Sequence, residues 1–243
     1  MTPTHQERIA LNLAEIRQRM AAAAARSGRS AESVSLVAVT KYVELDKIRA
    51  LVAAGVTLLG ESRPQQLWQR AELLADLPVR WHLIGHLQRN KVRRTLDLVD
   101  MIHSVDTLEL LQAANRIAEE MAAAATGTRP RVRVLLEVNT SGEAAKHGFD
   151  PQTLPAVIDQ LPKMPQVEVR GLMCMAGLEG GPQRARGDFR ALRELRDRLV
   201  APLPDGVLLS ELSMGMSGDY EVAIEEGATL VRIGSALFEG TDA

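Results

Sequence analysis

Eight short apolar runs, separated by helical patterns or turns, constrain the fold of this chain more than any other feature. The first run, Val34–Lys41, is nearly continuous and rich in β-branched residues, as in strands that are buried on both faces. The other seven runs are Val56–Gly60, Val79–Gly85, Asp100–Val105, Arg131–Asn139, Val167–Met175, Leu208–Gly215 and Thr229–Gly234. Strands that alternate with helices pair in parallel through right-handed crossovers. The alternation therefore predicts an α/β protein with a parallel sheet.

The number of units and the length of the chain favour a closed barrel over an open sheet. A (β/α)8 barrel takes roughly 250 residues, and this chain has 243. No G-x-G-x-x-G follows the first run, which disfavours an open dinucleotide-binding sheet. Apolar residues at helical spacing precede the first run at Ile9, Leu13, Ile16 and Met20. We predict one domain over residues 1–243, a TIM barrel with an extra N-terminal helix.

Charge, cysteine usage and hydropathy argue against several partners and locations. The formal net charge of -2 gives no electrostatic reason to expect nucleic acid or an anionic membrane as partner. The single cysteine, Cys174, cannot form an internal disulfide, which favours a cytoplasmic setting. No apolar run approaches the length of about 18 residues typical of a membrane span, and the N-terminus carries no signal-peptide pattern.

Polar residues at the ends of the predicted strands are the candidates for chemistry, because active sites of such barrels lie at the carboxyl ends of the strands. These residues are Lys41, Glu61, Ser62, His82, His86, Asn139, Ser213–Ser217, Arg232, Gly234 and Ser235. Lys41 is the strongest candidate, since an ammonium removed from water at a strand end becomes a more available amine nucleophile. A surface lysine just past a strand is the alternative.

Two glycine-containing segments, SMGMSGDY and GATLVRIGSALF, follow the last two strands. The backbone N–H groups of Met216, Ser217 and Gly218, and those of Gly234 and Ser235, are available to an anion there. Barrels frequently bind phosphate at these two loops. A plain helix cap and a tight turn are the alternatives. Together the segments predict a phosphate site.

Arg232 lies within the last strand, where a charge needs a partner or a ligand. Closure of the barrel places this strand beside the first, so Arg232 and Lys41 are expected to lie near each other. A reactive lysine, an arginine and a phosphate site are the parts that a pyridoxal phosphate site needs.

Other polar residues are weaker candidates. His82 and His86 are four residues apart on a strand-to-loop segment and need not face one metal, so no metal site is predicted. Asp106, with Glu109 three residues later, is interpreted as the start of a helix. Lys146 and His147 lie in a loop after the fifth strand, either as plain surface or beside the site.

At these residues the sequence resembles the pyridoxal phosphate homeostasis proteins. The matching stretches are LVAVTK, WHLIGHLQRNK, IHSVDT, EVNTSGEAAKHGF, VRGLMCM and LSMGMSGDYEVAIEEGATLVRIGSALF. The resemblance implies a barrel like the N-terminal domain of alanine racemase and a Schiff base on Lys41. It also implies phosphate contacts from Ser217, Gly234 and Ser235, with Arg232 beside the pyridine nitrogen. Met216, Ser62 and His82 complete the expected cofactor site.

The sequence departs from the family pattern around the second strand and after the lysine. Ser62 stands where an asparagine is common, Arg63 where a tyrosine is, and Val43 where a second lysine often follows. These departures concern contacts to the face of the cofactor ring and any lysine-to-lysine transfer.

Three functions are compatible with these residues. The resemblance implies a protein that binds and buffers pyridoxal phosphate and delivers it to apoenzymes, without robust catalysis. A barrel without the racemase β-domain loses that enzyme's dimer surface, which favours a monomer. An amino-acid racemase-like enzyme is the first alternative, although a racemase needs a second acid/base group. A barrel enzyme that uses Lys41 on a sugar phosphate is the second.

Overall fold

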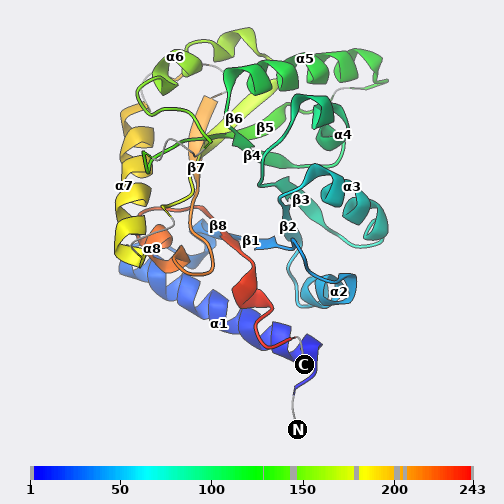
Figure 1. Ribbon diagram of the computed structural model, residues 1–243, viewed down its shortest axis with the longest axis vertical. Helices are drawn as coiled ribbons and strands as arrows, with labels where there is room; N and C mark the ends of the chain where they lie inside the picture. The colour runs from blue at the N-terminus through cyan, green and yellow to red at the C-terminus, as the bar shows by residue number, and fades with distance from the viewer. Residues whose placement is uncertain are drawn as a thin grey trace.

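The computed structural model describes residues 3–127, 129–142, 147–177, 181–199, 203–204 and 207–241. Eight parallel strands close into a barrel in chain order, and helices surround it (Figure 1). The strands are β1 (Ser35–Val39), β2 (Leu58–Glu61), β3 (Arg80–Leu83), β4 (Met101–Val105), β5 (Val132–Glu137), β6 (Val167–Met173), β7 (Val207–Ser213) and β8 (Leu230–Ile233). The predicted TIM barrel is confirmed, and each of the eight apolar runs overlaps one strand, although β2 ends one residue after its run and β7 begins one residue before its run.

The helices surround the barrel as expected of crossover connections. They are α1 (His5–Arg26), α2 (Leu45–Ala53), α3 (Pro64–Leu73), α4 (Val92–Leu96), α5 (Leu108–Ala124), α6 (Leu154–Ile158), α7 (Gly181–Leu199) and α8 (Tyr220–Glu225). Short 3-10 turns are η1 (Ala31–Ser33), η2 (Arg89–Lys91), η3 (Leu161–Lys163) and η4 (Ser235–Leu237). In the described part of the chain, no helix is long and apolar enough to cross a membrane.

The expected N-terminal helix is α1, which begins with a capping box between Thr4 and Glu7. The start expected at Asp106 is wrong by one residue. Thr107 caps α5, since its hydroxyl accepts a hydrogen bond from the amide of Leu110. Asp106 therefore stays outside the helix, and its carboxylate is free to face the end of the barrel.

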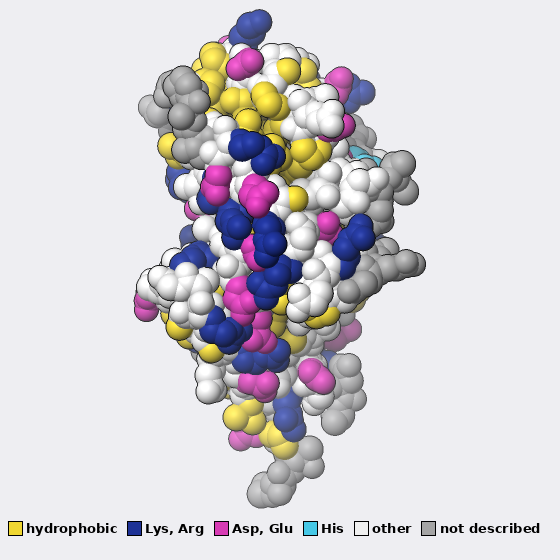
Figure 2. Space-filling model, turned by 90° about the vertical axis from the view of Figure 1, so that its left-hand side faces the viewer, with side chains coloured by type: hydrophobic (Ala, Val, Ile, Leu, Met, Phe, Trp, Pro, Cys, Tyr) yellow, Lys and Arg dark blue, Asp and Glu magenta, His cyan; other side chains and the backbone are white. Residues whose placement is uncertain are grey.

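Ion pairs connect α1, α8 and α7 on one side of the barrel, where Figure 2 shows acidic and basic side chains intermingled. The pairs join Arg19 and Arg26 to Glu221, Arg26 and Arg186 to Glu225, and Arg186, Arg190 and Arg193 to Glu226. The basic residues of α7 thus meet carboxylates of this chain.

The inside of the barrel has an apolar layer below a polar one. Val37, Leu58, Met101, Leu135, Met173 and Leu230 form a buried cluster separate from the larger core between barrel and helices. Side chains of a strand alternate between its two faces, so residues two positions onward lie one layer nearer the carboxyl end. On β4, β5 and β8 these residues are His103, Glu137 and Arg232, all buried. These three buried polar residues thus lie at the end where barrel enzymes bind ligands.

Candidate functional site

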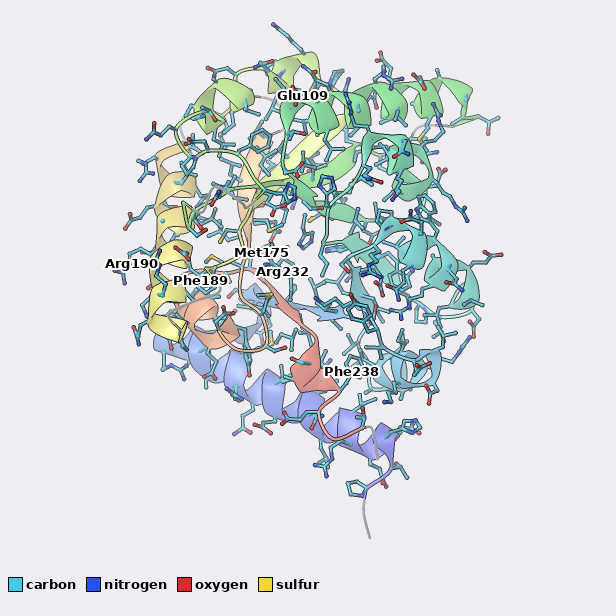
Figure 3. All side chains as sticks on the ribbon, viewed as in Figure 1. Glu109, Met175, Phe189, Arg190, Arg232 and Phe238 are labelled. Atoms are coloured by element: carbon cyan, nitrogen blue, oxygen red, sulfur yellow. The ribbon has the colours of Figure 1, made fainter. Side chains whose placement is uncertain are left out.

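A chain of hydrogen bonds crosses the polar layer of the barrel. His82 Nδ1 lies 2.8 Å from His103 Nε2, and His103 Nδ1 lies 2.9 Å from the Ser213 hydroxyl oxygen. Arg232 donates to the same hydroxyl at 2.5 Å and to the carbonyl of Cys174 at 2.9 Å. Figure 3 places Arg232 near the middle of the barrel. Residues on β3, β4, β7 and β8 thus form one network that fixes the orientation of the buried Arg232 guanidinium.

Burial determines the charge of these groups. It lowers the pKa of His82 to about 4, with the charges of Arg80 and Arg133 adding to the effect. It also lowers the pKa of His103 well below its usual value. Both imidazoles are therefore neutral at pH 7, whereas Arg232 remains a cation even though burial lowers its pKa. The polar layer offers a ligand one fixed positive charge.

Strand pairing brings Arg232 and the end of β1 together as expected. Val37 pairs with Arg232 and Ala38 with Ile233 in the β1–β8 ladder. Lys41 follows two residues after β1 ends, next to the fully buried Thr40. Its side chain is exposed, and its ammonium makes no ion pair or hydrogen bond with any residue that the structure describes. The expectation that the Lys41 ammonium is removed from water is therefore wrong for the protein without a ligand.

Arg70 holds the backbone on either side of Lys41, a role that the sequence did not reveal. Its guanidinium donates to the carbonyl of Thr40 and, at 2.6 Å, to that of Val43. It also pairs with Glu61, whose carboxylate accepts from the Thr40 hydroxyl at 2.6 Å. Glu61 at the end of β2 was one of the strand-end candidates, but its partner on α3 carried no motif. The arrangement makes Arg70 a positioning residue for Lys41.

The loops after β7 and β8 meet at the Ser217 hydroxyl. Its oxygen accepts from the amides of Gly234 at 3.2 Å and Ala236 at 3.4 Å. Two backbone N–H groups thus converge on one oxygen, which is the geometry that an anion requires. A Cβ added at Gly234 would lie 3.2 Å from Cβ of Val39. The absence of a side chain at Gly234 therefore lets this loop lie close to β1.

Not every donor expected in these loops is available. The amide of Met216 donates to the Asp219 carboxylate at 2.6 Å, so the free N–H expected at this position is absent from the structure. Ser217 and Gly234 are half-buried, and Ser235 is exposed. The converging donors therefore come mainly from the β8 loop.

The departures from the family pattern lie beside Lys41. Arg63 donates to the Tyr42 hydroxyl at 3.0 Å, and its guanidinium lies over the ring of Tyr42. Tyr42 has φ of 65°, a left-handed conformation that is costly for a bulky residue. Ser62 is half-buried, and Val43 is half-buried with its carbonyl on Arg70. In this chain an arginine–tyrosine pair thus flanks the lysine.

The remaining candidates lie elsewhere at the barrel mouth. His86 does not join His82, because its Nδ1 lies 3.1 Å from the Asp106 carboxylate. His147 also lies beside Asp106, at 3.5 Å. Lys146 lies outside the described residues.

Comparisons with known proteins identify the family of this chain. The family described as "Alanine racemase, N-terminal domain" matches residues 11–242. The chain is 40% identical to the pyridoxal phosphate homeostasis protein of Aquifex aeolicus over 226 residues, which are 93% of this chain and 95% of the relative. It is 43% identical to the protein of the same name from Deinococcus radiodurans over 218 residues, 89% of this chain and 94% of the relative.

Solved structures with similar folds include PipY and alanine racemases. PipY of Synechococcus elongatus with pyridoxal phosphate bound has a TM-score of 0.81 and 36% identity, covering 95% of this chain and 99% of PipY. An alanine racemase of Clostridium difficile has a TM-score of 0.72 at 15% identity, which supports the fold alone; the match covers 95% of this chain and 56% of the racemase. The chain therefore belongs to the alanine racemase N-terminal domain family and, within it, to the pyridoxal phosphate homeostasis proteins.

Proposed function

We propose that this protein binds pyridoxal 5′-phosphate reversibly through Lys41 and serves cofactor homeostasis. The observation that carries the proposal is the convergence of two backbone N–H groups on Ser217, next to a buried arginine and beside the strand that leads to Lys41. PipY, which is 36% identical to this chain, has pyridoxal phosphate bound in its structure.

The residues of the site fit the two ends of such a cofactor. A phosphate at the Gly234 and Ala236 amides would replace the Ser217 oxygen as their acceptor, and Ser217 and Ser235 would add hydroxyl donors. Arg232, held by Ser213 and Cys174, would face the pyridine nitrogen. Ser62, His82 and Met216 are proposed to contact the ring and its surroundings.

The amine of Lys41 is the covalent partner. When bound, pyridoxal phosphate would supply an aldehyde carbon, and Nζ of Lys41 would be the amine that holds it, with loss of one water. The exposure of Lys41 allows exchange with free cofactor or with an acceptor protein. Arg70 and Glu61 hold the backbone around it, so the amine can move while its attachment point stays in place.

We propose delivery to apoenzymes rather than robust catalysis as the role of this site. A guanidinium at the pyridine nitrogen does not transfer a proton to it, so the ring is a poorer electron sink. A racemase also needs an acid/base group on the opposite face of the ring. A cytoplasmic location is proposed because the chain has a single cysteine, Cys174, and therefore no internal disulfide.

The colour of the purified protein tests the proposal. We expect an absorption band of a lysine-bound cofactor, which borohydride bleaches while fixing the cofactor to the peptide that contains Lys41. Lys41→Ala should abolish the fixed label, whereas the exposed Lys163→Ala should retain it. Protein that stays colourless after addition of pyridoxal phosphate would refute binding and favour the sugar-phosphate alternative. Racemisation of an amino acid at ordinary enzyme rates, abolished by Lys41→Ala, would refute the non-catalytic role.

A further inference from the structure

Three ligand-bearing side chains meet at the mouth of the barrel on the side away from Lys41. His86 follows β3, Asp106 follows β4 directly, and His147 follows β5. In a closed barrel with strands in chain order, these elements lie across the mouth from β8 and β1. The cluster therefore shares no residue with the site assigned to the cofactor.

The geometry of the cluster is tight. Nδ1 of His86 lies 3.1 Å, and Nδ1 of His147 3.5 Å, from the same carboxylate oxygen of Asp106. The two imidazole rings are stacked, with centroids 5.0 Å apart and an angle of 26° between their planes. One potential ligand atom from each of the three residues lies within 4.8 Å of the others. The ligand atoms of a tetrahedral zinc ion are about 3.3 Å apart, which follows from bond lengths near 2.0 Å.

The carboxylate of Asp106 is not fully satisfied by these neighbours. Its side chain is 3% exposed, and Oδ1 is buried without a hydrogen-bond partner among the described residues. A buried oxygen without a partner is costly for a carboxylate. Glu137, at the carboxyl end of β5, adds a second buried acid. A cation placed here would lower both costs.

An ordinary histidine–aspartate ion pair on the surface lacks the features of this cluster. The His5–Asp46 pair elsewhere on the surface has one histidine, both side chains exposed and a distance of 3.8 Å. At Asp106, by contrast, two exposed histidines share one oxygen of a buried carboxylate. A hollow of about 390 Å³ lined by His86, Asp106 and Thr107 gives access from solvent.

We propose that His86, Asp106 and His147 form a binding site for a divalent transition-metal ion, with Zn²⁺ as the best match. Two imidazole nitrogens and one carboxylate oxygen are a ligand set that zinc uses in proteins, and they leave a fourth position open to water or to an exchangeable group. The site joins the loops after β3, β4 and β5 and does not depend on the bound cofactor.

Zinc titration of the tag-free, full-length protein after removal of metals by a chelator tests the proposal. Calorimetry should detect one equivalent of Zn²⁺, and Co²⁺ should give the visible absorption of a tetrahedral ion. His86→Gln and His147→Gln alter exposed side chains, so both variants should fold and bind Zn²⁺ at least tenfold more weakly. His5→Gln is the matched control and should bind as the parent does.

Lys41→Ala distinguishes this site from the cofactor site. Unchanged zinc affinity in Lys41→Ala supports the proposal, whereas a loss equal to that in His86→Gln would place the metal on the cofactor and overturn it. The proposal is also overturned if no saturable binding occurs. Equal affinity in the parent, His86→Gln and His147→Gln would do the same.

Discussion

The guanidinium of Arg70 on α3 donates a hydrogen bond to the backbone carbonyl of Thr40, the residue that precedes Lys41. The same guanidinium pairs with the fully buried Glu61 and reaches the carbonyl of Val43. A helix outside the barrel thus fixes the strand end that carries the lysine. Both the stability of the fold and the position of the amine depend on this contact.

Replacing Arg70 should therefore lower the free energy of unfolding strongly. In Arg70→Met, Glu61 remains as a buried carboxylate without its partner, and its Oε2 already lacks a hydrogen bond among the described residues. Breaking a buried pair on one side costs about 3–5 kcal/mol, which urea unfolding should detect. Arg49→Met, at an exposed pair with Asp76, should cost less than about 1 kcal/mol. Equal losses in the two variants would contradict the positioning role.

Much of this architecture could be predicted from the sequence, because parallel strands buried on both faces produce continuous apolar runs. Each of the eight runs overlaps a strand, and their number favours a closed barrel. Closure alone brings β8 beside β1, so the proximity of Arg232 to the strand of Lys41 needed no further information. The end-of-strand rule also identified Ser217 and Gly234.

Contacts made by side chains from helices and loops could not be predicted in this way. Arg70 lies on α3 among other polar residues, and nothing in its spacing indicates that it turns inward to Glu61. Similarly, His147 and His86 are 61 positions apart in the chain, so the sequence favoured no metal site. Only the barrel brings both to Asp106. The start of α5 differed because Thr107 competes with Asp106 as cap.

Ser213→Ala should weaken the polar layer inside the barrel. The hydroxyl accepts from Arg232 and contacts His103, so its removal leaves two buried polar groups with fewer partners. We expect a loss of about 1–3 kcal/mol in the free energy of unfolding and a shifted absorption band of the bound cofactor. Ser210→Ala, at an exposed position of the same strand, is the control and should change neither. An unaltered stability in Ser213→Ala would show that the hydroxyl does not organise Arg232.

Gly215→Ala should distort the loop after β7. Gly215 has φ of 91°, and an added Cβ would lie 2.5 Å from Cβ of Ala223 and 3.0 Å from Cα of Tyr220. Both the backbone and α8 would have to shift, so thermal unfolding should occur at a lower temperature and pyridoxal phosphate should bind more weakly. Gly187→Ala is the contrast, since this exposed helical glycine has no atom within 4 Å of the new methyl group. It should stabilise the protein by about 0.5–1 kcal/mol.

The buried histidines should make the protein sensitive to mild acid. The pKa of His82 is lowered from its usual 6.5 to about 4, so the unfolded chain binds its proton at a higher pH than the folded protein does. The stability that this provides is present above pH 6.5 and is lost as the pH falls toward 4; for His82 the loss is about 3 kcal/mol. The lowered pKa of His103 adds to this loss of stability in acid. The raised pKa of Glu137 opposes the loss, because the folded protein binds that proton at a higher pH than the unfolded chain does.

Urea unfolding at pH 7.5, 5.5 and 4.5 measures this dependence on pH. In His82→Gln the free energy of unfolding should be lower at pH 7.5 but should fall less between pH 7.5 and 4.5, because one neutral histidine has been removed. His5→Gln changes an exposed imidazole and should leave the profile as it is in the parent protein. If His82→Gln and His5→Gln lose stability equally on acidification, the acid sensitivity arises elsewhere. The histidine chain would then contribute packing and hydrogen bonds to the barrel but no response to pH.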